Sequence, residues 1–137
     1  MSKHVDNVPT WVRVMVGIFG IITIYAGVKC YLDPAIVYGN VPGIDATNIL
    51  VKETAYEVAS VYLALGLAMG FVTIIRGAPE ALVILTIVRA LTEIQAIITY
   101  VALRDIHPSI LTGVVSLLIE IWMIKTLIGV IKKEEGE

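Results

Sequence analysis

Three ionisable residues, Arg89, Glu93 and Glu120, each lie near the middle of an apolar stretch long enough to cross a bilayer. A charge at that depth costs at least about 2.5 kcal/mol, so it persists where it is paired, hydrated or required for function. A guanidinium and two carboxylates could hold a helix register, move a proton, bind a cation or polar ligand, or act as acid and base. These residues are therefore the first candidate site.

Arg89 and Glu93 are four residues apart, so on a helix their side chains share one face at about 6 Å from each other. Thr86, Ala96 and Tyr100 continue this face. Because it carries charge and hydroxyl groups, we expect it to point into the protein.

Glu93 and Glu120 lie at similar depths on consecutive predicted helices. At about 1.5 Å per residue, each lies about 17 to 18 Å from the start of its helix. The two carboxylates of antiparallel neighbours then meet near the midplane. A guanidinium carries five donors in a flat fork, so we predict that Arg89 binds both carboxylates. Two acids facing one base leave a negative charge unless a proton, water or a further cation compensates.

The composition places the chain in lipid. Of 137 residues, 58% are hydrophobic and 16% are charged, and the mean hydropathy is +0.88, so too little polar surface is available for a water-soluble protein of this size. The net charge of −2 offers no basic excess, so we expect no nucleic-acid partner. Cys30 is the single cysteine and no Cys/His cluster occurs, so we predict no metal and no cofactor.

Four segments reach the roughly 20 apolar residues that a spanning helix needs. Continuous apolar runs without period-two alternation indicate helices rather than barrel strands. The sequence thus predicts an all-α fold, a four-transmembrane-helix bundle forming one membrane domain over residues 1–137. The predicted helices cover about 11–31, 56–76, 81–103 and 109–131, with an extracytoplasmic loop at 32–55.

Lysine and arginine counts near the helix ends predict the orientation. The side with both termini carries Lys3, Arg13, Arg76, Lys132 and Lys133, and the other side carries Lys29, Lys52 and Arg104. We therefore predict cytoplasmic termini in an inner (cytoplasmic) membrane. Within the long loop, Ala35–Tyr38 is either a short interfacial helix or ordered loop, and both remain open.

Small residues form stripes on the first two predicted helices, at Gly17, Gly20 and Gly27 and at Gly66 and Gly70. Such stripes let helix backbones approach closely in lipid. We expect these helices to pack within one chain, with a dimerisation face as the alternative.

Other polar groups have simpler interpretations. Lys29 and Glu57 fall near the outer ends of the first two helices, where they could pair. Asp105 and His107 are too few for a metal ligand set, so a hydrated turn is expected there.

Several short motifs resemble the uncharacterised bacterial four-helix proteins related to the DoxX-like families. They are Tyr31-Leu32-Asp33-Pro34, Ala64-Leu65-Gly66, Arg89 and Leu118-Ile119-Glu120. The resemblance implies a four-helix bundle with Asp33, Arg89 and Glu120 as polar positions, whereas Glu93 and Gln95 look like additions. It implies no particular reaction.

Three alternative functions are compatible with these features. The first, which we favour, is a non-catalytic subunit or homo-oligomeric component of a membrane complex, with the charged residues stapling the bundle. The second is a carrier or channel for a proton or small polar solute. The third is a binder or enzyme for a lipid-soluble molecule such as a quinone or sterol, although no nucleophile, metal set or cofactor motif accompanies the carboxylates.

Overall fold

The computed structural model describes residues 7–38, 43–45, 47–103 and 108–136. Within these residues the chain is all-α. It forms four long helices, α1 (Thr10–Leu32), α3 (Ile49–Ile74), α4 (Pro79–Leu103) and α5 (Pro108–Glu135), and one short helix, α2 (Ala35–Tyr38). All four long helices in the described part of the chain are long and apolar enough to cross a membrane. The predicted fold class is confirmed, and the chain is a small multi-pass membrane protein in contact with lipid.

The largest difference from the expected helix bounds is at the start of α3. α3 begins at Ile49 rather than Tyr56, because the Asn48 side chain accepts a hydrogen bond from the Leu50 amide at 2.9 Å and satisfies a free donor of the first turn. Of the two alternatives for Ala35–Tyr38, the structure has the helix, and its place at the membrane interface stays a prediction. The Asp33 carboxylate accepts from the Ala35 amide at 3.2 Å at its start.

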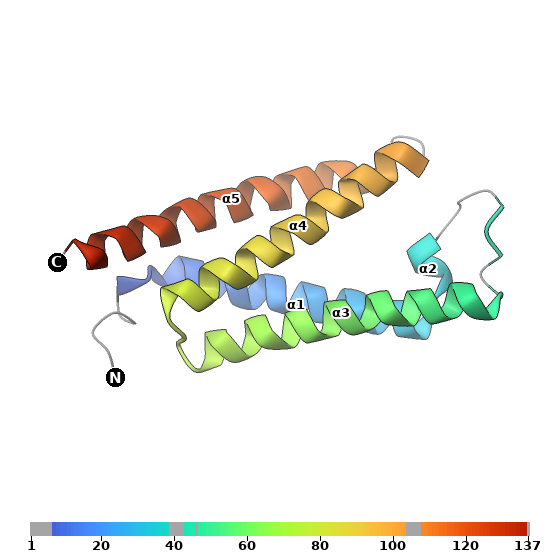
Figure 1. Cartoon of the computed structure of the whole chain (residues 1–137), viewed down its shortest axis with the longest axis horizontal. Coiled ribbons are helices and arrows are strands. Elements are labelled where there is room, and N and C mark those ends of the chain that lie inside the picture. Colours follow the sequence, from blue (N-terminus) through green and yellow to red (C-terminus); the bar gives the residue numbers. More distant parts are fainter. Residues whose placement is uncertain (1–6, 39–42, 46, 104–107, 137) are drawn as a thin grey trace.

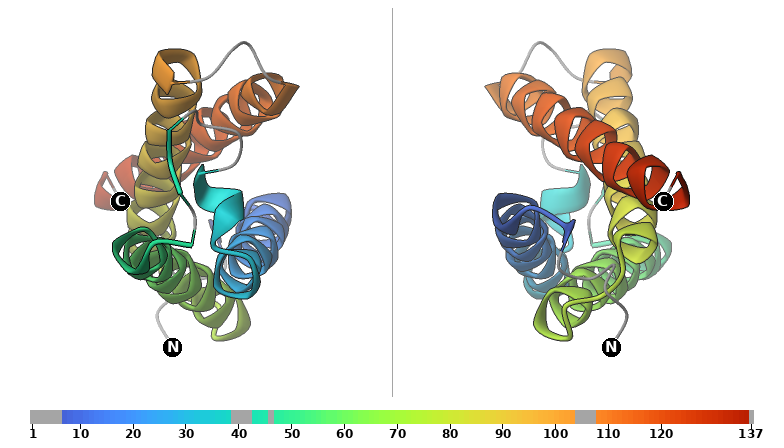
Figure 2. Two further views of the ribbon diagram at one scale, coloured as in Figure 1. Left: turned by 90° about the vertical axis from the view of Figure 1, so that its right-hand side faces the viewer. Right: turned by 90° about the vertical axis from the view of Figure 1, so that its left-hand side faces the viewer.

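The long helices form two pairs, α1 beside α3 and α4 beside α5 (Figure 1). The pairs lie close together where α1 begins, α3 turns into α4 and α5 ends, which we call the terminal end. They diverge toward the far end, where α3 begins and α4 ends. Viewed along the long axis, the α1–α3 pair and the α4–α5 pair occupy opposite sides of the molecule (Figure 2).

The apolar core between the pairs is concentrated in the terminal half. Its buried residues are Val8, Val12, Val16, Phe19, Leu65, Met69, Leu82, Met123 and Leu127. A polar contact joins α1 to the turn between α3 and α4 at this end, since Arg13 Nη1 donates to the Gly77 carbonyl at 3.0 Å. The rings of Trp11 and Trp122 lie 4.9 Å apart, so α1 also contacts α5 here.

The seam between α1 and α3 depends on glycines. A Cβ atom on Gly66 would lie 2.8 Å from the Gly20 carbonyl oxygen, and one on Gly27 would lie 2.8 Å from Leu63 Cγ. A Cβ on Gly17 would be 3.3 Å from Thr73 Cγ2. The backbones therefore approach closely within one chain, as small residues permit in lipid.

Gly70 differs from the other predicted packing glycines. A Cβ atom at this position would meet nothing within 4 Å. Its backbone is near Gly20, but its missing side chain points into open space, so close packing does not require a glycine there. The turn predicted at Asp105 and His107 lies outside the described residues.

Candidate functional site

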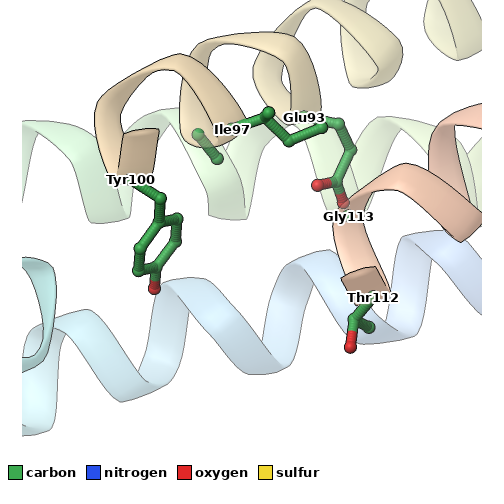
Figure 3. A pocket seen from close by; sticks show the side chains of 6 residues that line it. Glu93, Ile97, Tyr100, Thr112 and Gly113 are labelled. Carbon is green, nitrogen blue, oxygen red and sulfur yellow. The ribbon is translucent and has the colours of Figure 1, made fainter. Parts of the chain in front are cut away.

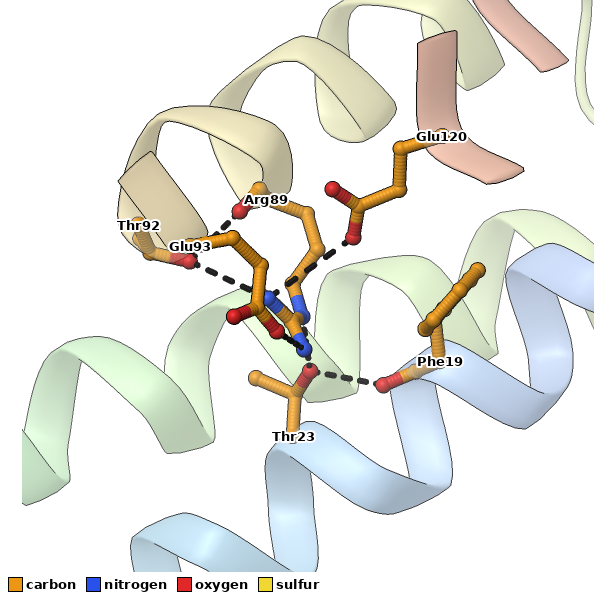
Figure 4. Close-up of polar contacts among 6 residues, drawn as sticks. All are labelled: Phe19, Thr23, Arg89, Thr92, Glu93 and Glu120. Atoms are coloured by element: carbon orange, nitrogen blue, oxygen red, sulfur yellow. Dashed lines mark hydrogen bonds and ion pairs between the residues drawn. The ribbon is translucent and has the colours of Figure 1, made fainter. Parts of the chain in front are cut away.

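The structure brings the three central charged residues together at the junction of the two helix pairs. Arg89 and Glu93 project from α4 and Glu120 from α5, while Thr23 of α1 reaches them from the other pair (Figure 4). Arg89 is 6% exposed and Glu120 is fully buried. We call these four residues the junction cluster.

Arg89 contacts both helix pairs. Its Nη2 lies 2.5 Å from Glu93 Oε1, and its Nη1 lies 3.7 Å from Glu120 Oε1. Its Nε donates to Thr23 Oγ1 at 3.0 Å, across to α1. The guanidinium carbon also lies 5.7 Å from the centre of the Phe19 ring, within range of a cation–π interaction. One side chain thus joins α4 to α1 and α5.

Two threonine hydroxyls also accept hydrogen bonds from Arg89. Thr23 Oγ1 donates to the Phe19 carbonyl at 2.6 Å while it accepts from Arg89. Thr92 Oγ1 donates to the Arg89 carbonyl at 2.6 Å and accepts from Arg89 Nη1 at 3.4 Å. Each hydroxyl therefore uses its proton on its own helix and offers a lone pair to the guanidinium.

Glu120 is less well satisfied than Glu93. Both of its carboxyl oxygens are buried and accept no hydrogen bond from any residue that the structure describes. Its distance of 3.7 Å from Arg89 Nη1 exceeds that of an N–H···O hydrogen bond. Arg89 therefore binds Glu93 closely and compensates Glu120 through charge at longer range.

A half-enclosed cavity of about 230 Å³ lies between α4 and α5, with Glu93 in its wall (Figure 3). Its lining residues are Glu93, Ala96, Ile97, Tyr100, Thr112 and Gly113. The α4 face that carries Arg89 thus continues through this cavity as far as Tyr100. The cavity gives the carboxylate of Glu93 a second environment besides its ion pair.

The other polar residues considered from the sequence lie outside the junction cluster, and of these Tyr100 lines the cavity. Exposed Gln95 donates to Thr99 Oγ1 at 3.4 Å on its own helix. Asp33 caps α2, about 15 Å along α1 from Thr23 at 1.5 Å per residue.

The expected ion pair between Lys29 and Glu57 does not form. The Lys29 ammonium lies 5.6 Å from the centre of the Tyr25 ring instead, where it can make a cation–π contact on its own helix. Both Lys29 and Glu57 are exposed on the helix surface, so neither needs a partner to offset burial.

Thr23, Thr92 and Phe19 escaped the sequence-based prediction of the site. Thr23 carries a recognisable signal, because it is a hydroxyl residue in the middle of an apolar span, where such groups commonly bond across helices. Phe19 carries no such signal, since one aromatic residue in an apolar helix is ordinary.

Among the described residues, no group of three His, Cys, Asp or Glu side chains could hold a metal ion. No protein-family model, curated protein or solved structure matches this chain. The junction cluster and its cavity therefore have to be interpreted from their own geometry.

Proposed function

We propose that this protein is a non-catalytic component of a membrane complex, as a subunit or homo-oligomer, whose junction cluster staples two helix pairs together. The observation that carries the staple role is that buried Arg89 bonds to Thr23 of the other pair while its charge faces Glu93 and Glu120. A buried ion group of this kind selects one helix register, because displaced helices would leave its charges unpaired.

The native mass of the protein, extracted gently from its own membrane with lipids and neighbours retained, tests the complex. A defined stoichiometric assembly with copies of itself or with other chains is the expected result. A single chain without partners would contradict the subunit proposal. The staple role is tested separately, by the stability of variants of the junction cluster.

The variant Glu120→Gln separates the staple role from proton or solute transport. An amide keeps the shape and polarity of the side chain, so folding and assembly should be nearly unchanged if Glu120 is structural. Flux of protons or small solutes into proteoliposomes that depends on Glu120, and is abolished in Glu120→Gln, would favour the carrier function instead. Glu57→Gln, on the exposed surface of α3, is the matched control.

We also infer kinship with the DoxX-like four-helix proteins, a location in the inner membrane and cytoplasmic termini. Support comes from the short motifs around Asp33, Arg89 and Glu120 and from the lysine and arginine bias. Reporter fusions test the orientation. A reporter active only in the cytoplasm should work at the C-terminus and fail when inserted at Gly43, and the reverse pattern would overturn the topology.

A further inference from the structure

The cavity beside Glu93 has the volume of a small molecule. Its volume of about 230 Å³ is below the range of about 300 to 1,000 Å³ that drug-sized ligands occupy. At about 30 Å³ for each water-sized group, it accommodates roughly seven or eight non-hydrogen atoms. A ligand of that size would touch both α4 and α5.

The charge on its wall favours a cation. Glu93 Oε1 binds Arg89, whereas Oε2 faces the cavity, 3.4 Å from the position of a Cβ atom on Gly113 (Figure 3). Glu120 lies two turns beyond Gly113 on the same face of α5. Among the residues that the structure describes, Arg89 is the one cation paired with these two carboxylates. A cation beside Glu93 would compensate the remaining negative charge in a medium where unbalanced charge is costly.

The remaining walls favour an organic cation over a metal ion. Ala96, Ile97 and Gly113 offer apolar contact, and the Tyr100 ring offers the face of an aromatic group. The lining side chains that carry oxygen are Glu93, Tyr100 and Thr112, which is fewer than the six or more oxygens that calcium prefers. An ammonium group on a short carbon chain can pair with the Glu93 carboxylate and contact both the apolar residues and the Tyr100 ring.

We propose that this cavity binds a small organic ammonium group, with Glu93 as its counter-ion, Tyr100 as its aromatic wall and the Thr112 hydroxyl as a hydrogen-bonding partner. The site runs about 10 Å along α4 from Glu93 toward the far end. A free amine or the ammonium of a lipid headgroup entering from that end presents the same chemistry. This binding role goes beyond the staple, because Arg89 can join the helix pairs whether or not the cavity is filled.

Binding of radiolabelled choline and ethanolamine to the full chain in phosphatidylglycerol nanodiscs tests the proposal, with empty nanodiscs as background. Saturable binding with one site per chain is expected for at least one of the two amines. The neutral isostere of choline, 3,3-dimethylbutanol, should not compete. Absence of saturable binding of both amines would overturn the proposal, as would equal competition by the neutral alcohol.

Two variants locate the binding. Glu93→Gln should weaken it by about tenfold or more, which is about 1.4 kcal/mol or more. Ala96→Leu fills the cavity and keeps every charge, so it should weaken binding equally. Glu57→Gln removes an exposed carboxylate from α3 and should bind as the parent does. If Ala96→Leu folded and bound the amines as tightly as the parent, the site would not be this cavity.

The source of the ammonium group is decided by repeating the measurement in phosphatidylcholine and phosphatidylethanolamine nanodiscs. Competition from these headgroups, seen as weaker binding of the free amine than in phosphatidylglycerol, identifies a lipid as the occupant. Unchanged binding identifies a free amine. The staple role is measured by the stability of variants that lose the Arg89 contacts, whereas this site is measured by amine binding. Failure of the staple role and failure of this site are therefore distinguishable.

Discussion

The α1–α3 seam and the junction between the helix pairs are held together by opposite means. Along the seam, Gly20 and Gly66 bring two backbones into direct contact. At the junction the pairs are diverging, and the long side chain of Arg89 reaches across to Thr23. Glycine permits contact only where helices are already close, whereas arginine can join helices that are further apart.

The two regions also differ in how much free energy is lost when their helices separate. Lipid is as apolar as the seam, so separated glycine faces lose packing but expose no buried charge. Separating the junction leaves a guanidinium or a carboxylate without compensation in low dielectric. The junction should therefore be the more sensitive region to single substitutions, and the following predictions test that comparison.

The largest effect is expected for Arg89→Met, which leaves fully buried Glu120 and partly buried Glu93 without their cation. The loss should be about 3 to 5 kcal/mol. Unfolding by SDS titration, followed by the fluorescence of the adjacent Trp11 and Trp122, measures it. Stability equal to that of the parent would refute the staple role.

A neutral version of the junction sharpens this test. Arg89→Met combined with Glu93→Gln and Glu120→Gln removes all three charges together, and should recover most of the stability lost in Arg89→Met alone. Buried ion groups replaced as a whole are often neutral or stabilising, in contrast to those broken at one partner. A triple variant as unstable as the single one would mean that shape, rather than charge balance, determines the cost.

A smaller effect is expected at the seam. Gly66→Ala places a Cβ atom 2.7 Å from Ile24 Cγ1 and 2.8 Å from the Gly20 carbonyl oxygen, and overpacking of this kind costs about 1 to 3 kcal/mol. Gly70→Ala is the matched control, since its Cβ meets nothing within 4 Å. Both variants gain the same helix propensity, so equal stabilities in the SDS titration would contradict the close approach.

Thr23→Val should cost about 1 to 3 kcal/mol, toward the lower end of that range, because Arg89 Nε loses its acceptor while the ion pairs remain. Thr126→Val is the control, since the Thr126 hydroxyl donates to Trp122 on its own helix at an exposed position. A cycle with Arg89→Met isolates the coupling. If Thr23→Val were equally harmful with and without Arg89, the cross-helix bond would contribute nothing.

The smallest effect is expected outside the membrane, at Asp45. The side-chain and backbone hydrogen bonds of Thr47 hold the pKa of the Asp45 carboxyl below its usual range. Its stabilisation of the turn is therefore complete above the pKa of the unfolded chain and is lost as pH falls through the lowered pKa. The Thr47 amide resonance should titrate with that lowered midpoint and stop titrating in Asp45→Asn, and a midpoint at or above the ordinary Asp value would contradict it.

The sequence by itself determined the class of the protein and the identity of its central charges. Lipid requires every spanning backbone group to bond internally, so four apolar runs of sufficient length already specify four helices. The helical period likewise places Arg89 and Glu93 on one face. These results rest on local rules that need no knowledge of neighbouring helices.

Only the tertiary structure decided which helices approach and how far they diverge. Thr23 became a partner of Arg89 because α1 lies opposite α4 at that depth, and Gly70 proved unnecessary because its missing side chain faces open space. The cavity at Glu93 exists because α4 and α5 leave space between them at this depth. Distances between helices depend on the packing of every side chain along them, and a periodic pattern in one helix contains no measure of that packing.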